Sequence, residues 1–176
     1  LIPLIARLRS HDATQLPRFR AELLGLTLLI SGGLWLLCWL GLPALLRSGW
    51  LGLSGQALNE GLRMVGGLAL LAPFGVLISL FSATLLAAGR HRNTLFEGIP
   101  ALVLLIFLLL PPAWMPEPLL WGTLAGVALH AAALAAPLRR YGELPLPVFT
   151  QHSPAWQSFW GSIGIMAVGQ LLMSFT

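Results

Sequence analysis

The sequence predicts an all-α fold, a polytopic transmembrane helical bundle of about five spans within a single membrane domain over residues 1–176. Two observations lead to this prediction. Hydrophobic residues make up 57% of the chain and charged residues 9%, which is far from the composition of a soluble domain. Apolar runs of roughly twenty residues recur along the chain, and a helix of that length crosses a hydrocarbon core of about 30 Å.

Arginine, proline or glutamate marks the ends of the apolar runs and sets the boundaries of the predicted spans. The clearest run, from Leu23 to Leu46, has no ionisable side chain apart from the thiol of Cys38. A single cysteine excludes an internal disulfide and a cysteine-based metal site within this chain. A proline-rich tight turn at 111–118 separates the third span from the fourth. The predicted spans are 22–46, 64–89, 98–115, 119–138 and 156–176.

The arginines fall mainly on one side of this alternating topology. Eight of them lie in the segments 1–21, 90–97 and 139–155, and only Arg47 and Arg63 lie in the opposite loops. Cytoplasmic loops carry the excess of basic residues, so we expect the three arginine-rich segments to be cytoplasmic. Because the arginines are spread over short loops and form no continuous stripe, the net charge of +4 does not indicate a nucleic-acid partner.

The second span contains Pro73 and Gly75, our candidates for a gate or hinge. A proline inside a helix removes one backbone hydrogen bond and favours a kink, and a nearby glycine makes bending easier. A static kink is the alternative interpretation. In the fourth span, Gly122 and Gly126 form a GxxxG pair, which lets two helix backbones approach closely.

His130 is the ionisable residue that lies midway along a predicted span. Such groups are costly to bury and are functional candidates by default, so His130 is a candidate for substrate binding or for a proton relay. A neutral histidine hydrogen-bonded to a neighbouring helix is the alternative. Near the first span, Leu16, Phe19 and Leu23 fall on one helical face, so the segment 18–22 is expected to begin as an amphipathic, interfacial stretch.

Arg90 and Arg92 are candidates for binding an anionic headgroup at the membrane surface. Membrane topology and lipid anchoring would also explain them. The chain has no catalytic signature such as HExxH, GxSxG, CxxC or a phosphate-binding loop, and its six acidic residues are not paired within a span. We therefore expect no enzyme activity, no cofactor and no metal site.

In the order and spacing of these features the chain resembles the lipid II flippases of the MurJ (MviN) kind, in the multidrug/oligosaccharidyl-lipid/polysaccharide exporter superfamily. Residues Leu1–Ala6 are similar to the exit from the second helix of that family, and Ser79–Arg90 to the end of its fourth helix. Residues Pro137–Gly142 resemble its exit from helix six, and Ser153–Gln170 its approach to helix seven. The cavity arginines of the family lie on helices that this chain does not contain, so no substrate-binding residue is carried over.

The resemblance implies a fragment, from the end of helix two to helix seven, of a transporter with about fourteen spans. The expected function is to flip an undecaprenyl-pyrophosphate-linked glycan precursor, with lipid II for peptidoglycan synthesis as the leading candidate, from the inner to the outer leaflet of the bacterial cytoplasmic (inner) membrane by alternating access. Its partners would be that lipid-linked substrate and membrane lipids, with a coupling ion or the membrane potential as a further candidate. The alternatives are an exporter of another lipid-linked oligosaccharide or polysaccharide, a membrane scaffold, and a membrane enzyme of glycan assembly.

Overall fold

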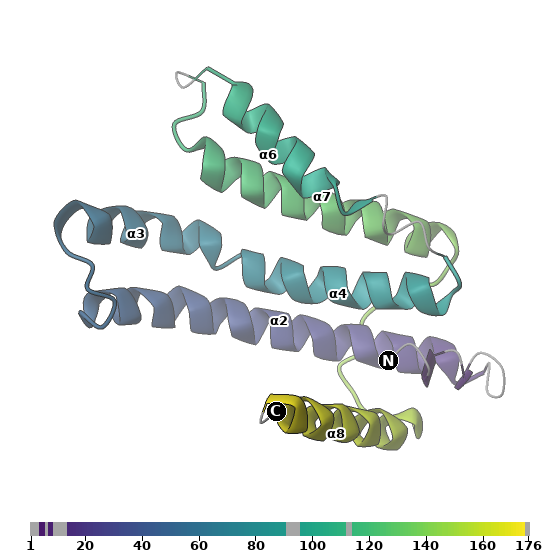
Figure 1. Cartoon of the computed structure of the whole chain (residues 1–176). Helices are drawn as coiled ribbons and strands as arrows, with labels where there is room; N and C mark the ends of the chain where they lie inside the picture. Colours follow the sequence, from purple (N-terminus) through teal and green to yellow (C-terminus); the bar gives the residue numbers. More distant parts are fainter. Residues whose placement is uncertain (1–3, 6, 9–13, 91–95, 112–113, 175–176) are drawn as a thin grey trace.

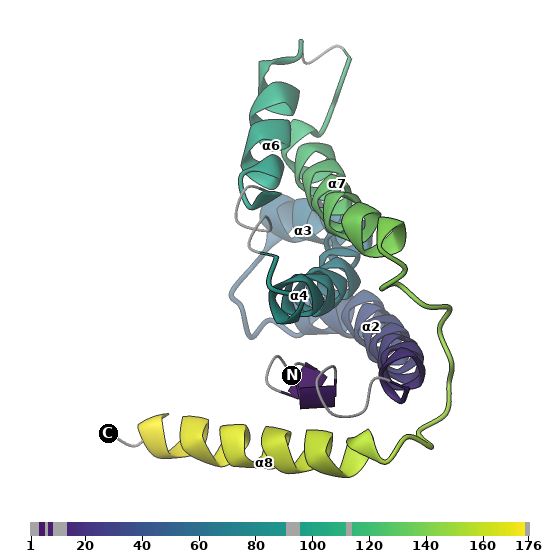
Figure 2. The same ribbon diagram turned by 90° about the vertical axis from the view of Figure 1, so that its right-hand side faces the viewer.

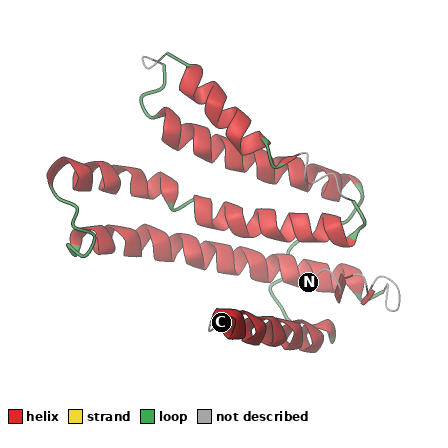
Figure 3. Ribbon diagram, in the orientation of Figure 1, coloured by secondary structure: helices red, strands yellow, loops and turns green. Residues whose placement is uncertain are grey.

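The computed structural model describes the chain except residues 1–3, 6, 9–13, 91–95, 112–113 and 175–176. Throughout this described part the regular structure is helical, with no strand (Figure 3). The principal helices are α2 (Leu16–Arg47), α3 (Gly55–Leu68), α4 (Leu71–Ala87), α6 (Ile99–Leu109), α7 (Pro118–Arg140) and α8 (Ala155–Ser174).

The molecule is a helical membrane bundle. Among the described residues, three segments are long and apolar enough to cross a membrane: α2, the α3–α4 pair taken together, and α7. Figure 1 shows α3 and α4 following one another alongside α2, with α7 packed on α4 and the shorter α6 beside α7. Many large apolar side chains on α2 and α6 are exposed, including Leu37, Leu40 and Leu109. Lipid contact would cover these surfaces in a membrane.

Helix α2 begins six residues before the predicted span and so includes Arg18 and Arg20. Its first turns carry an apolar face in which Leu16, Phe19 and Leu23 are all buried, packed in one cluster with residues at the start of α8. The amphipathic beginning predicted for this helix is therefore present. On the same turns Arg18 is exposed, Arg20 pairs with Glu143, and Glu22 binds the segment that precedes α8.

The predicted span at 64–89 corresponds to two helices, because the hydrogen-bond ladder is interrupted at Ala69 and Leu70. Both residues keep helical dihedral angles, so the interruption lies in the hydrogen bonds. Pro73 has no N–H to donate to the carbonyl of Ala69, four residues earlier. The amide of Leu70 donates to the nearer carbonyl of Gly67, and the bond from Phe74 to Leu70 is long at 3.4 Å. Helical structure also begins at Gly55, nine residues before the predicted span.

The GxxxG pair of α7 faces α6 and confirms the predicted close approach of two backbones. A Cβ on Gly126 would lie 2.8 Å from the Cα of Pro100, and a Cβ on Gly122 would lie 2.9 Å from the Cβ of Phe107. Only glycine allows α6 and α7 to approach this closely. Helix α6 has 11 residues and ends at Leu109, six residues before the predicted end.

Helix α8 runs crosswise to α2, as the two views in Figures 1 and 2 show together. An extended segment over residues 144–152 leads into it from the end of α7. Among the α8 residues whose burial the structure describes, the buried ones are Ala155 and Trp156 in the first turn, and both join the cluster on α2. Its hydropathy is lowered by Gln157 and several serines and glycines, and it is not among the three candidate spans.

Candidate functional site

The C-terminal ends of α4 and α7 lie at the same end of the bundle as the N-terminus of α2 (Figure 1). Arg18, Arg20, Arg90, Arg139 and Arg140 are therefore gathered at this end, which we call the arginine-rich end. The opposite end holds an ion pair between Arg63 of α3 and Glu117, which precedes α7. Arginines at helix C-termini are favoured by the negative end of the helix dipole.

Helices α4 and α7 end in the same way. Each is followed by a glycine in the left-handed region, and backbone amides beyond the helix donate hydrogen bonds back to carbonyl groups of its last turn. After α4, Gly89 has φ of 71°, and the amide of Arg90 donates to the carbonyl of Leu85 at 3.0 Å. After α7, Gly142 has φ of 66°, and the amide of Glu143 donates to the carbonyl of Leu138 at 2.8 Å. This is the Schellman arrangement, which stops each helix sharply. It fixes the backbone at Arg90 and beside Tyr141.

A pocket of about 670 Å³ lies between these two helix ends. Its polar groups come from Arg90, Arg140 and Tyr141, and no acidic residue is among the described residues that line it. Its remaining lining residues are apolar or glycine: Leu85, Gly89, Phe96, Ala133, Ala136 and Pro137. Ligand sites commonly have volumes of about 300–1,000 Å³ and combine an apolar wall with a few polar groups, as this pocket does.

The guanidinium group of Arg90 lies on the face of the Tyr141 ring, with its central carbon 3.2 Å from the ring centroid. Stacking of this kind attracts the cation to the ring and restricts the arginine side chain. It uses the flat face of the guanidinium and leaves the N–H groups at its edge able to bind an anion. Within the described residues, neither Arg90 nor Arg140 makes an ion pair.

The other predicted site residues lie apart from this pocket. Arg92 lies outside the described residues. His130 is 9% exposed on α7 and does not line the pocket. Pro73 and Gly75 lie near the start of α4, far along the helix from Arg90. Of the sequence candidates, the structure thus places Arg90 in the pocket and adds Arg140 and Tyr141 to it.

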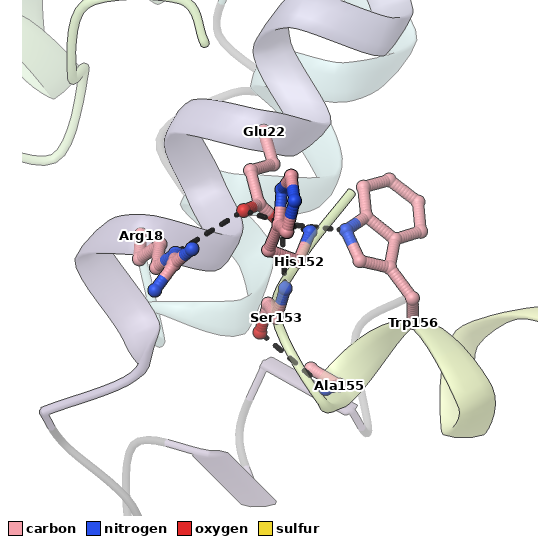
Figure 4. A network of polar contacts seen from close by, with 6 residues as sticks. All are labelled: Arg18, Glu22, His152, Ser153, Ala155 and Trp156. Atoms are coloured by element: carbon pink, nitrogen blue, oxygen red, sulfur yellow. Dashed lines mark hydrogen bonds and ion pairs between the residues drawn. The ribbon is translucent and has the colours of Figure 1, made fainter. Parts of the chain in front are cut away.

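A second cluster of polar contacts lies nearby and is centred on Glu22, whose side chain is completely buried on α2 (Figure 4). Its oxygen Oε2 accepts hydrogen bonds from the amide of Ser153 at 3.1 Å and the indole N–H of Trp156 at 2.6 Å. Its oxygen Oε1 accepts from the amide of His152 at 3.2 Å and from Nε of Arg18 at 3.3 Å. These donors satisfy a carboxylate that would otherwise be costly to bury.

The segment before α8 is attached to α2 at two further points. The amide of Val148 donates to the carbonyl of Ala21 at 2.9 Å, and a Cβ on Gly25 would lie only 2.2 Å from the carbonyl oxygen of Val148. Arg20 also forms an ion pair with Glu143 at 3.7 Å. Gly25 and Glu22 therefore shape a docking surface on α2 for the segment that leads into α8.

Sequence reasoning did not identify Glu22, because its main partners lie 130 or more positions away along the chain. The available signal was a single acidic residue at the start of an apolar run. Among the residues that the structure describes, no group of three His, Cys, Asp or Glu side chains could hold a metal ion. Comparison with known protein families, curated proteins and solved structures finds no match for this chain.

Proposed function

We propose that this chain belongs to a membrane transporter that flips an undecaprenyl-pyrophosphate-linked glycan precursor, with lipid II as the leading substrate. The observation that carries the proposal is the interrupted helix formed by α3 and α4, with Pro73 as the third residue of α4. Interrupted membrane helices are typical of transporters that work by alternating access, because they allow parts of a bundle to rearrange. The resemblance of the sequence to lipid II flippases supplies the substrate class.

The physical problem in such transport is to move a polar, anionic headgroup through hydrocarbon. A charged group at the centre of a bilayer costs several kcal/mol unless it is paired or hydrated, on the order of 3 kcal/mol by insertion measurements. A bundle with two alternative arrangements offers the headgroup a polar route while the lipid tail stays in the bilayer. We place the arginine-rich end on the cytoplasmic side of the bacterial inner membrane, according to the positive-inside rule.

In this proposal Pro73 and Gly75 allow α4 to bend, and Arg90 and Arg92 attract the headgroup before it enters. Two observations, one hydrogen bond and one open space, support flexibility near Gly75. The hydroxyl of Ser79 donates to the carbonyl of Gly75 at 2.9 Å, and such a bond often bends a helix. A Cβ on Gly75 would meet no atom within 4 Å, so its immediate surroundings leave room for movement.

The test is to express the full-length protein in cells depleted of their own lipid II flippase. Outward exposure of lipid II is followed with a labelling reagent that stays in the periplasm, and membrane insertion is checked by an epitope tag. We expect labelling to be restored. With insertion demonstrated, unrestored labelling would remove lipid II as the substrate.

Two further measurements separate the alternatives. Other lipid-linked glycans are tested in cells that lack the corresponding exporter. Restored export of one of them would identify that glycan as the substrate in place of lipid II. Rescue that persists in a Pro73→Ala variant at the rate of the unaltered protein would contradict the role given to the interrupted helix. A matched Gly66→Ala variant on α3, where a Cβ meets no atom within 4 Å, controls for helix stabilisation alone.

A further inference from the structure

The pocket at the arginine-rich end combines two features that a single ligand would have to match. Arg90 and Arg140 are among the residues that line it, and its apolar wall includes Leu85 and Ala136. Guanidinium groups bind phosphate oxygens through paired N–H donors. An apolar wall in a protein excludes water and favours a hydrocarbon chain.

We propose that this pocket binds the phosphate group of an anionic lipid, with a hydrocarbon chain of the same lipid against the apolar wall. A bare phosphate would fill only a small part of about 670 Å³ and would leave that wall uncovered. A neutral lipid would leave two guanidinium groups without an anionic partner. The phosphate can come from a bilayer phospholipid or from a lipid-linked diphosphate.

The stacking of Arg90 on Tyr141 prepares one side of this site. Because the ring holds the guanidinium at 3.2 Å from its centroid, less side-chain freedom is lost when the phosphate binds. The two Schellman turns fix the backbone on both sides, at Gly89 and Gly142. Glu143, which would repel a phosphate, forms an ion pair with Arg20 and does not line the pocket. This inference does not depend on the proposed transport function.

The experiment measures which lipid stays bound to the purified full-length protein. The protein is placed in nanodiscs that contain equal amounts of phosphatidylglycerol and phosphatidylcholine. It is then released from the nanodiscs, and native mass spectrometry measures the mass of the protein together with any lipid that stays bound. We expect one retained phosphatidylglycerol and no comparable retention of phosphatidylcholine. Arg140→Ala should lower the retention of phosphatidylglycerol about fivefold.

Arg139→Ala is the matched control, because Arg139 is the exposed neighbour of Arg140 on α7 but does not line the pocket. It should leave retention unchanged. Equal losses in the two variants would show a general attraction of the surface for anionic lipids and would overturn the site. Ala136→Phe keeps both arginines and fills the apolar part of the pocket, so it should also lower lipid retention.

Competition identifies the source of the phosphate. Displacement by undecaprenyl diphosphate at equal concentration would assign the site to a lipid-linked diphosphate, and persistence of phosphatidylglycerol would assign it to a bilayer phospholipid. Either result supports an anionic lipid. Displacement by millimolar inorganic phosphate, or unchanged lipid retention in Ala136→Phe, would overturn the proposed role of the hydrocarbon chain.

Discussion

The indole N–H of Trp156 donates to Oε2 of Glu22 at 2.6 Å, and this bond joins the first turn of α8 to the first turns of α2. The Trp156 ring also packs edge-on against Phe19, with ring centroids 5.3 Å apart. One polar and one apolar contact thus act on the same side chain. Together with the amides of His152 and Ser153, they determine where α8 leaves the bundle.

Replacing Glu22 with alanine is expected to lower the free energy of unfolding by roughly 3 kcal/mol, because the variant leaves several buried donors without an acceptor. Denaturant unfolding of the detergent-solubilised protein measures the change. Glu60→Ala is the control, since Glu60 is exposed on α3, and should change stability by no more than about 0.5 kcal/mol. Equal effects of the two substitutions would contradict the role assigned to Glu22.

Gly25 and Gly33 on α2 form a second matched pair. Gly25→Ala should displace the segment before α8, because the new Cβ would lie 2.2 Å from the carbonyl oxygen of Val148. Gly33→Ala meets no atom within 4 Å and should stabilise the helix by up to about 1 kcal/mol. Limited proteolysis of residues 143–152 measures the difference. Cleavage there should become faster only in Gly25→Ala; unchanged cleavage would show that the segment does not depend on this contact.

The close packing of α6 on α7 depends on Gly126. Gly126→Ala is expected to destabilise the protein by about 1–3 kcal/mol, because its Cβ would lie 2.8 Å from the backbone of Pro100 and overpack the contact. Gly66→Ala on α3 has open space and serves as the control. Thermal unfolding in detergent compares the two. A Gly126→Ala protein as stable as the control would mean that α6 can shift without cost.

The sequence predicted the helical membrane fold because the length of an apolar run is a local property, set by the thickness of the bilayer. It also predicted a close approach of two helix backbones through the spacing of Gly122 and Gly126, and the structure identifies α6 as the partner helix. The helical residues from Gly55 to Arg63 were not predicted, because the charged residues in this segment were interpreted as part of a loop. In the structure Glu60 is exposed and Arg63 pairs with Glu117, so the helix accommodates both charges.

The candidate sites were only partly predictable. Arg90 could be singled out by its place at the end of a span, but its contact with Tyr141 requires the packing of α4 on α7. The same holds for Arg140, which the sequence explained by topology alone. The Glu22 cluster was not predictable, because one acidic residue in a sequence does not indicate which distant backbone amides it will bind.

Pro73→Ala is the most direct test of the interrupted helix. The variant supplies an N–H that can donate to the carbonyl of Ala69, so it should join α3 to α4 and raise the thermal stability of the protein. If bending at this point is part of transport, outward exposure of lipid II should fall about tenfold, which corresponds to about 1.4 kcal/mol in the barrier. Lipid II exposure is measured in the depleted cells, and thermal stability is measured on membranes prepared from the same cultures.

Pro43 provides the control for this test, because it lies inside α2, which continues through it from Leu16 to Arg47. Pro43→Ala also adds a backbone donor to a membrane helix and should raise stability without lowering transport. A loss of transport in both variants would point to a general effect of stiffening the bundle. Loss in Pro73→Ala alone locates the required movement at the junction of α3 and α4, where the ladder of hydrogen bonds is already interrupted.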